Sequence, residues 1–125
     1  MNIIKLNATE STNSFLKELL LTQNVDNFTV VITDNQKKGK GQIGAVWNSE
    51  SGKNLTFSLL VKDFVVNASS VFILNTLISI SLIKALEKFK INDLSIKWPN
   101  DILSERKNIS GILIENIFKG SSEII

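Results

Sequence analysis

Residues 36–60 read QKKGKGQIGAVWNSESGKNLTFSLL, a basic, glycine-rich loop that leads through a tryptophan into an apolar strand. We expect its three closely spaced glycines, Gly39, Gly41 and Gly44, to reach positive φ and to let a ligand approach the backbone. The interleaved lysines suit a carboxylate or phosphate, and Trp47 offers an apolar face to a ring. A solvated hairpin loop is an equally good interpretation, because a lone Gly-x-Gly is weak evidence.

The composition excludes several kinds of chemistry. The chain has 125 residues, enough for one domain or part of one, and 43% of them are hydrophobic, as in a globular protein. It has no cysteine and no histidine, so thiolate metal sites, catalytic imidazoles and disulfides are excluded. The net charge of +2 includes no basic block, and we therefore expect no DNA binding.

The N-terminal residues lack a basic region followed by a long apolar run, so no signal peptide is indicated and a cytoplasmic location is expected. The apolar stretch 65–86 is not expected to span a membrane, because eight polar residues interrupt it. These are Asn67, Ser69, Ser70, Asn75, Thr76, Ser79, Ser81 and Lys84.

Hydrophobic periodicity and turn residues predict five strands and two helices. The segment 54–61 is apolar on both faces and is predicted to be an internal strand. The longer helix is assigned to the core, because Val71, Leu74, Leu77 and Phe89 belong to a broad apolar face. The predicted strands are 2–6, 28–33, 54–61, 94–97 and 109–117, and the predicted helices are 12–21 and 68–89.

Four ordered motifs across about a hundred residues resemble the signature of the biotin protein ligases. The loop supplies Gly-Lys-Gly-x-x-Gly-x-x-Trp-x-Ser at 39–49, followed by Gly52, Asn54, Leu55 and Ser58. The other motifs are Ser11-Thr12-Asn13, the Lys-Trp-Pro-Asn-Asp of 97–101, and the Gly-Ile-Leu-x-Glu of 111–115.

The resemblance implies an α+β fold, a mixed, mostly antiparallel sheet with helices packed on one face. It also implies an enzyme that joins biotin to ATP with Mg²⁺ and then transfers the biotinyl group to a lysine. The acceptor would be the biotin carboxyl carrier domain of acetyl-CoA or pyruvate carboxylase. When the carboxylate is held in line with the α-phosphate, and lysine and magnesium neutralise the developing negative charge, such a reaction needs no histidine or cysteine.

Site residues are carried over from the matching motifs. Lys40, Asp101 and Lys107 are the expected catalytic residues, and Asp101 is also the expected magnesium ligand. Without the resemblance, the first motif needs only to cap a helix, Gln36 is a surface residue, and 98–101 is a turn. The expected biotin-binding residues are Ser11, Thr12, Asn13, Gln36, Gly39, Lys40, Gly41, Gln42 and Gly111, and those for ATP are Trp47, Asn100 and Asn108.

The chain departs from the family pattern at charged positions. Lys40, Gln42 and Ala45 stand where the family often has arginines, so bidentate phosphate binding is lost. The family's usual lysine two residues before Ser110 is Asn108 here, with Lys107 beside it. Because adjacent strand residues point to opposite faces, Lys107 can substitute only if a bulge or loop redirects it.

The matched motifs cover the first half of a usual ligase. We therefore expect residues 1–125 to be a catalytic domain that is incomplete at its C-terminal end, with no N-terminal helix-turn-helix domain. Strand edges left unpaired would favour association with another copy as a homodimer.

Two other functions stay open. A lipoate or octanoyl ligase shares the fold, but its ligand has no ureido ring, and Gln36 with the Ser-Thr-Asn motif argues against it. Asn108 and Gln42 leave room for a non-catalytic biotin-binding or carrier-docking module.

Overall fold

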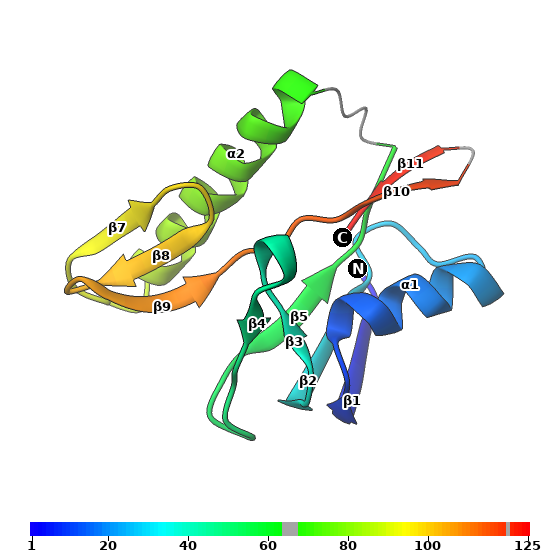
Figure 1. Cartoon of the computed structure of the whole chain (residues 1–125), viewed down its shortest axis with the longest axis horizontal. Helices are drawn as coiled ribbons and strands as arrows, with labels where there is room; N and C mark the ends of the chain where they lie inside the picture. The colour runs from blue at the N-terminus through cyan, green and yellow to red at the C-terminus, as the bar shows by residue number, and fades with distance from the viewer. Residues whose placement is uncertain (64–67, 120) are drawn as a thin grey trace. The chain divides into compact units, whose positions relative to one another are not determined.

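The computed structural model describes residues 1–63, 68–119 and 121–125 (Figure 1). It divides into two compact units, one formed by Met1–Phe64 with Glu115–Ile125 and the other by Val65–Ile114. Helices and mostly antiparallel strands make it a mixed α+β protein, which confirms the expected fold class.

A three-stranded sheet in the order β1-β2-β5 is the frame of the first unit. β1 (Ile3–Thr9) runs parallel to β2 (Val30–Gln36), and β2 pairs antiparallel with β5 (Thr56–Leu59). The parallel register places Thr9 opposite Gln36. The end of β2 therefore lies at the point where the chain leaves β1 for the next helix.

The helix α1 (Thr12–Thr22) ends one residue beyond the prediction. Ser11 caps it, with extended backbone (φ −151°) and a side-chain oxygen that accepts from the backbone N–H of Ser14 at 3.4 Å. α1 packs against β2 and β5. The core of this unit consists of Leu16, Leu20, Val25, Val31, Leu60 and Ile125.

The predicted internal strand 54–61 is wrong in two respects. In the described residues β5 pairs with β2 alone, so it is an edge strand, and Phe57 is 48% exposed. The chain then passes into β6 (Val61–Lys62), which pairs with β11 (Ser121–Ile124) in another sheet. The apolar residues of this segment thus belong to two short strands, β5 and β6, that lie in different sheets.

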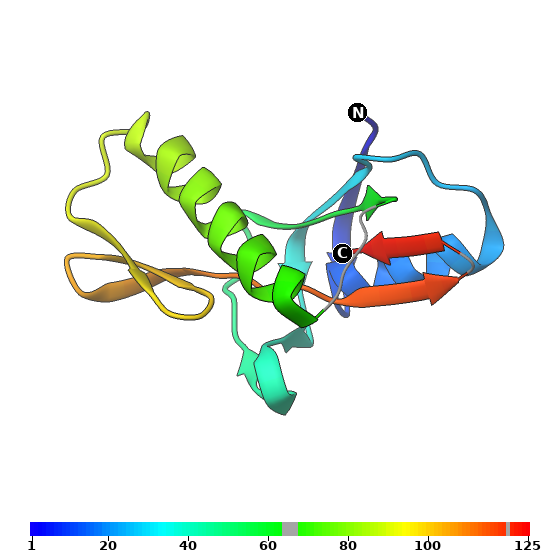
Figure 2. The same cartoon turned by 90° about the horizontal axis from the view of Figure 1, so that it is seen from above.

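β10 (Asn116–Lys119) and β11 form an antiparallel hairpin that joins β6 (Figure 2). The predicted single strand 109–117 is also wrong, because residues 112–115 separate β10 from β9 (Lys107–Gly111). β9 pairs with β8 within the second unit, and β10 pairs with β11 within the first unit.

The glycine-rich loop is a small hairpin. β3 (Gly39–Lys40) pairs with β4 (Val46–Trp47) around the 3₁₀ turn η1 (Gln42–Gly44). Of the three glycines expected at positive φ, only Gly44 has it, at 75°. Gly39 is required for another reason, because a Cβ there would lie 2.2 Å from the carbonyl oxygen of Trp47.

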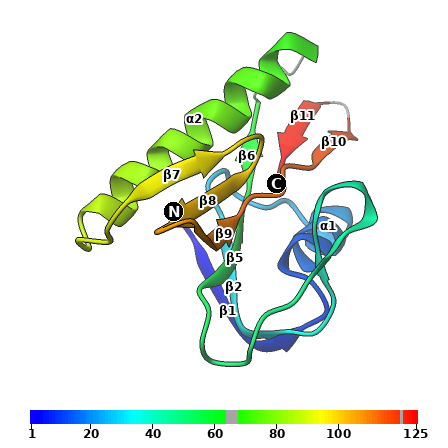
Figure 3. The same cartoon turned by 60° about the vertical axis from the view of Figure 1, so that its left-hand side comes forward.

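The second unit consists of α2 (Ala68–Glu87) and a sheet in the order β7-β8-β9 (Figure 3). β7 (Leu94–Lys97) matches its prediction, whereas β8 (Asp101–Ser104) was not predicted. Glu105 (φ 49°) and Arg106 (φ 65°) form the tight turn that joins β8 to β9.

α2 packs on β7 and β8, which cover only part of its apolar circumference. Leu74 is buried, but Leu77 is 53% exposed. The helix ends two residues before the predicted end, and Phe89, which lies beyond it, is 77% exposed. The assignment of the whole apolar face to the core is therefore wrong, since the apolar residues surround the helix and are not confined to the face that packs.

Within the described residues, one helix is long and apolar enough to cross a membrane by length and composition alone. This is the α2 segment Ser70–Glu87, with a mean hydropathy of 1.6 and 11% of the window buried. Core helices of soluble proteins pass the same test. The expected absence of a membrane span stays a prediction.

Candidate functional site

Buried polar side chains gather at the N-terminal end of α1. Ser11, Thr12 and Asn13 are 4%, 4% and 9% exposed, and Ser58 of β5 is 5% exposed. Polar groups removed from water need hydrogen-bond partners, and here they bond to one another. The hydroxyl of Ser58 lies 2.8 Å from that of Thr12 and is hydrogen-bonded to Asn13 Oδ1. Sequence alone required only that the first motif cap a helix.

Gln36 bonds to the same helix terminus. Its Oε1 accepts from the backbone N–H of Thr12 at 2.9 Å and lies 3.3 Å from the Thr12 hydroxyl. The first N–H groups of a helix have no partner within the helix, so the glutamine satisfies one of them. Its Nε2 lies on the side of Gly39, where a Cβ would approach it to 2.8 Å. Gln36 is therefore part of the cluster and not an isolated surface residue.

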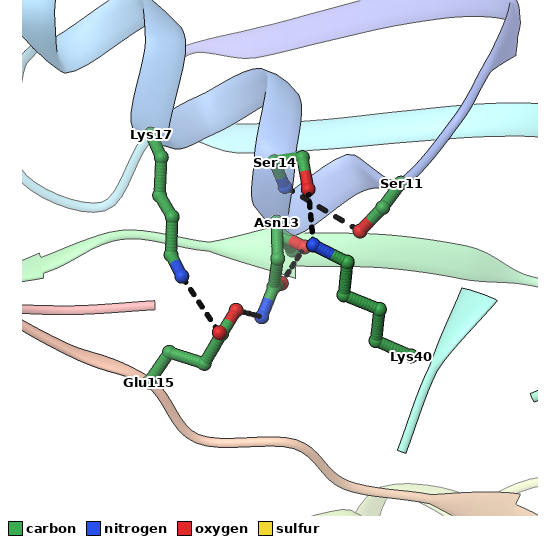
Figure 4. A network of polar contacts seen from close by, with 7 residues as sticks. Ser11, Asn13, Ser14, Lys17, Lys40 and Glu115 are labelled. Atoms are coloured by element: carbon green, nitrogen blue, oxygen red, sulfur yellow. Dashed lines mark hydrogen bonds and ion pairs between the residues drawn. The ribbon is translucent and has the colours of Figure 1, made fainter. Parts of the chain in front are cut away.

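A carboxylate completes the cluster from the other end of the chain (Figure 4). Glu115 Oε2 accepts from Asn13 Nδ2 at 2.8 Å, and Glu115 Oε1 is 2.6 Å from Lys17 Nζ. Burial raises the pKa of Glu115. The hydrogen bonds from Lys17 and Asn13 and the charges of Lys17 and Lys40 together lower the pKa by more than burial raises it. The net pKa lies below the usual value, so this carboxylate is ionised at neutral pH.

Lys40 brings a positive charge to the same helix end. Its Nζ lies 3.1 Å from Ser14 Oγ in the first turn of α1 (Figure 4). Helix N-termini favour anions because their free N–H groups carry partial positive charge. The exposed ammonium and the helix end together suit a ligand carboxylate or phosphate.

The neighbouring Lys38 has a different partner. It pairs with Glu10 at 2.6 Å, and both side chains are well exposed. The hydrogen bond and charge of Lys38 lower the pKa of Glu10, and the charges of Lys40 and Lys37 lower it further. Within the described residues, Lys38 forms a direct ion pair, whereas Lys40 acts on Glu10 and Glu115 only through its charge at longer range.

The remaining loop residues of the predicted site lie in the β3–β4 hairpin. Gly41 donates its N–H to the carbonyl of Ala45 at 2.7 Å, Gln42 begins η1, and Trp47 is 37% exposed. In the part of the chain that the structure describes, no hydrogen bond joins the side chain of Gln42 to the cluster.

The predicted site residues 97–101 lie in the second unit and make local contacts. Asn100 Nδ2 donates to the carbonyl of Ile112 at 2.8 Å, and the N–H of Ile112 returns a bond to the Asn100 carbonyl at 2.9 Å. Asp101 Oδ2 lies 3.4 Å from Lys97 Nζ. The Asn100 amide thus fixes a turn, and Asp101 orients a lysine of its own hairpin.

A β-bulge redirects Lys107. β8 and β9 pair Ile102 with Ser110 and Leu103 with Asn108, which leaves Ile109 without an opposite residue. Directly opposed residues share a face, so the bulge puts Lys107 on the face of Ser110 and Asn108 on the other. The bulge that Lys107 needs in order to take the place of the family's usual lysine is therefore present. Its catalytic role stays a prediction.

The structure offers no multidentate metal site in its described ranges, where no three acidic, histidine or cysteine side chains gather. The magnesium prediction therefore rests on Asp101 alone. Gly111 lies opposite Asp101 in the same hairpin.

Three members of the cluster received no role from the sequence: Ser58, which is buried, and Lys17 and Glu115, which are partly exposed. Ser58 and Glu115 belong to the matching motifs, which was the available signal. Lys17 lies four residues after Asn13, a spacing that places both on one face of a helix. Only the fold brings Glu115 to them across about a hundred residues.

Comparison with known proteins identifies the family of the chain. Residues 6–125 match the biotin/lipoate A/B protein ligase family. The bifunctional ligase/repressor BirA of Bacillus subtilis is 31% identical over 96 residues, which cover 77% of this chain and 29% of that protein.

Solved structures are similar over nearly the whole chain. The biotin protein ligase of Aquifex aeolicus in complex with biotin and ATP has a TM-score of 0.74 and 34% identity, over 98% of this chain and 50% of that one. The biotin protein ligase of Leishmania major in complex with biotin has a TM-score of 0.80 over 98% of this chain and 54% of that one; at 24% identity, it shows the fold. The chain spans about half the length of these structures.

Proposed function

Since this chain belongs to the biotin/lipoate A/B protein ligase family, we propose that it serves the ATP-dependent activation of biotin to biotinyl-5′-AMP and its transfer to a lysine. The acceptor lysine belongs to the biotin carboxyl carrier domain of acetyl-CoA or pyruvate carboxylase. The proposed location is the cytoplasm, and DNA and membrane are not proposed partners.

The observation that carries the proposal is the buried cluster around Thr12, Asn13 and Gln36. A ureido ring presents N–H donors and a carbonyl acceptor side by side, and hydroxyl and amide side chains can match both. Because these side chains are fixed by their own hydrogen bonds, they lose little freedom when a ligand binds.

Lys40 is proposed to act on the charged end of biotin. A carboxylate oxygen attacks the α-phosphorus of ATP, the bond to the pyrophosphate oxygen breaks, and pyrophosphate leaves. Negative charge that develops on the α-phosphate is neutralised by the ammonium of Lys40, which lies at the helix end next to the cluster. The acceptor amine then attacks the acyl carbon, loses a proton and releases AMP.

The matching motifs supply the other proposed contacts. Lys107 is assigned to the carboxylate and α-phosphate, Asn100 to ATP and Gly111 to biotin. Because the bulge turns Asn108 to the face opposite Lys107, the expected contact of Asn108 with ATP is an alternative to that of Lys107. Trp47 of the first unit is assigned to adenine. Asp101 would be the protein ligand of Mg²⁺, an ion that commonly takes one or two carboxylates besides water and phosphate oxygens, and the bound ion would neutralise phosphate charge.

Adenylation by the purified chain tests the proposal. The chain is incubated with biotin, ATP and Mg²⁺, and biotinyl-5′-AMP and pyrophosphate are measured by mass spectrometry. Both products are expected, and lipoate in place of biotin should give neither. Biotin binding by calorimetry without adenylate would favour a non-catalytic binding module instead. No biotin binding would reject the proposed function.

A further inference from the structure

We propose that Glu115 is a positioning residue that sets the direction of a hydrogen-bond chain through Asn13 and Ser58, so that the Thr12 hydroxyl can only accept from a ligand. The inference rests on the proposed function and deepens it, because it names the feature of the ligand that the site selects.

The direction is set at the carboxylate. An ionised carboxylate accepts hydrogen bonds and donates none. The atom of Asn13 that lies 2.8 Å from Glu115 Oε2 must therefore be Nδ2, and Oδ1 is turned toward Ser58. Lys17 occupies the other carboxylate oxygen at 2.6 Å, which holds Glu115 in place.

The number of available protons determines which hydroxyl donates in the next two hydrogen bonds of the chain. Asn13 Oδ1 has no proton, so the single hydroxyl proton of Ser58 is directed to it. The contact of 2.8 Å between the hydroxyls of Ser58 and Thr12 is then a hydrogen bond only if Thr12 donates. This assignment follows from donor counting, since hydroxyl protons are placed by their partners.

Gln36 is satisfied without the Thr12 proton. Its Oε1 already accepts the backbone N–H of Thr12 at 2.9 Å, whereas the Thr12 hydroxyl is farther away at 3.3 Å. With Oε1 so fixed, Nε2 is the donor end of the amide, and within the described residues it makes no hydrogen bond. The cluster thus presents an acceptor, Thr12 Oγ1, and a donor, Gln36 Nε2, from adjacent side chains.

This arrangement selects a ring with an N–H next to a carbonyl, such as a cyclic urea. A ring that carries oxygen in place of the N–H directs a lone pair at the lone pair of Thr12 Oγ1. Thr12 is 4% exposed and Ser58 5%, so water cannot relieve the mismatch.

The test measures binding of biotin and of its two cyclic carbamate analogues, each with one ureido N–H replaced by oxygen. Calorimetry on the whole chain at pH 8 gives the affinity ratio of biotin to each analogue. For the wild type, we expect one analogue to bind at least about tenfold more weakly than biotin. In Glu115→Gln the new amide can donate as well as accept, Asn13 can turn over, and Thr12 can donate. We expect that ratio to fall to about threefold or less.

Two more variants separate direction from packing. Lys17→Met removes the ion pair but leaves an acceptor-only carboxylate, so the ratio should stay at the wild-type value. Ser58→Ala frees the Thr12 proton and should lower the ratio as Glu115→Gln does. Ser58→Ala takes the place of Glu115→Gln in the test if thermal unfolding shows that Glu115→Gln does not fold.

The outcomes are distinct. A wild-type ratio in folded Glu115→Gln or, if that variant does not fold, in Ser58→Ala overturns the inference and leaves the proposed function standing. An equal fall in Lys17→Met also overturns it, because charge or packing would then be responsible. A wild type that binds neither biotin nor the analogues rejects the proposed function and the inference together.

Discussion

Two groups of predicted site residues, one at the start of α1 and one in the β7–β9 hairpins, differ in how far along the chain their partners lie. Asn13 bonds to Glu115 and Ser58, 102 and 45 residues away. Asn100 bonds to Ile112, 12 residues away, and Asp101 pairs with Lys97, four residues away. The first group is buried and the second is at the surface of its unit or near it.

The difference separates two uses of polar residues. Long-range, buried hydrogen bonds fix side chains in one orientation and can define what a ligand must offer. Local hydrogen bonds between neighbouring residues fix turns and strand register. Asparagine and aspartate side chains form such bonds whether or not a ligand is bound. Substitutions should therefore affect ligand chemistry and stability more strongly in the first group than in the second.

The largest effect is expected at Lys40. Lys40→Ala should slow adenylate formation about a hundredfold or more, because the developing charge on phosphate loses its counter-charge, while biotin affinity changes only a few fold. Single-turnover adenylation and calorimetry give the two values. Lys38→Ala is the matched control, since Lys38 pairs with exposed Glu10. Equal losses of binding and adenylation in Lys40→Ala would contradict the assigned role.

Two asparagines compare the groups directly. Asn13→Ala leaves buried Ser58 and partly buried Glu115 each short of one hydrogen-bond partner, and should lower the free energy of unfolding by about 2 kcal/mol. Asn108→Ala removes an exposed side chain and should change it by less than about 0.5 kcal/mol. Urea unfolding of both variants gives the comparison, and similar losses would show that the groups do not differ.

Lys107 tests whether the second group takes part in chemistry. Lys107→Ala should lower the adenylation rate about tenfold with little change in stability. Asn108→Lys should not restore that rate in the same chain, because the bulge at Ile109 turns the two positions to opposite faces. Full restoration would mean that the register of β9 differs from the one described.

The smallest effect is a pH dependence of stability. The pKa of Glu115 in the folded chain is below its usual 4.5, so the ionised carboxylate stabilises the fold above that pH. This contribution is lost as the pH falls from about 4.5 through the folded-state pKa. Melting temperatures of the wild type and Glu115→Gln should therefore converge below pH 4.5. A constant gap down to pH 3 would contradict the assignment.

Local signals in the sequence predicted several elements well. Ser11 ahead of an apolar repeat predicted α1 within one residue of its end, and the turn that begins at Trp98 and Pro99 predicted where β7 ends. The same signals failed where one predicted strand covers parts of two. Residues 109–117 belong partly to β9 and partly to β10, because the sequence of one segment does not specify the strand with which each part will pair.

The glycine loop shows the same limit at the site. Its spacing indicated positive φ at three glycines, yet only Gly44 has it, and Gly39 instead makes room for the backbone of Trp47. That contact depends on the pairing of β3 with β4, which a Gly-x-Gly pattern does not specify.

By itself, the sequence determined the chemistry that is available and the order of the motifs. It offers no imidazole or thiolate, and it places Ser11 to Asn13, Gln36 and Lys40 ahead of Glu115 in the chain. The tertiary structure alone decided which of these groups meet. The parallel pairing of β1 and β2 brings Gln36 to the N–H of Thr12, and the return of the chain at Glu115 brings a carboxylate to Asn13. Hydrogen bonds act over about 3 Å, so residues a hundred positions apart acquire a shared function only after the chain has folded.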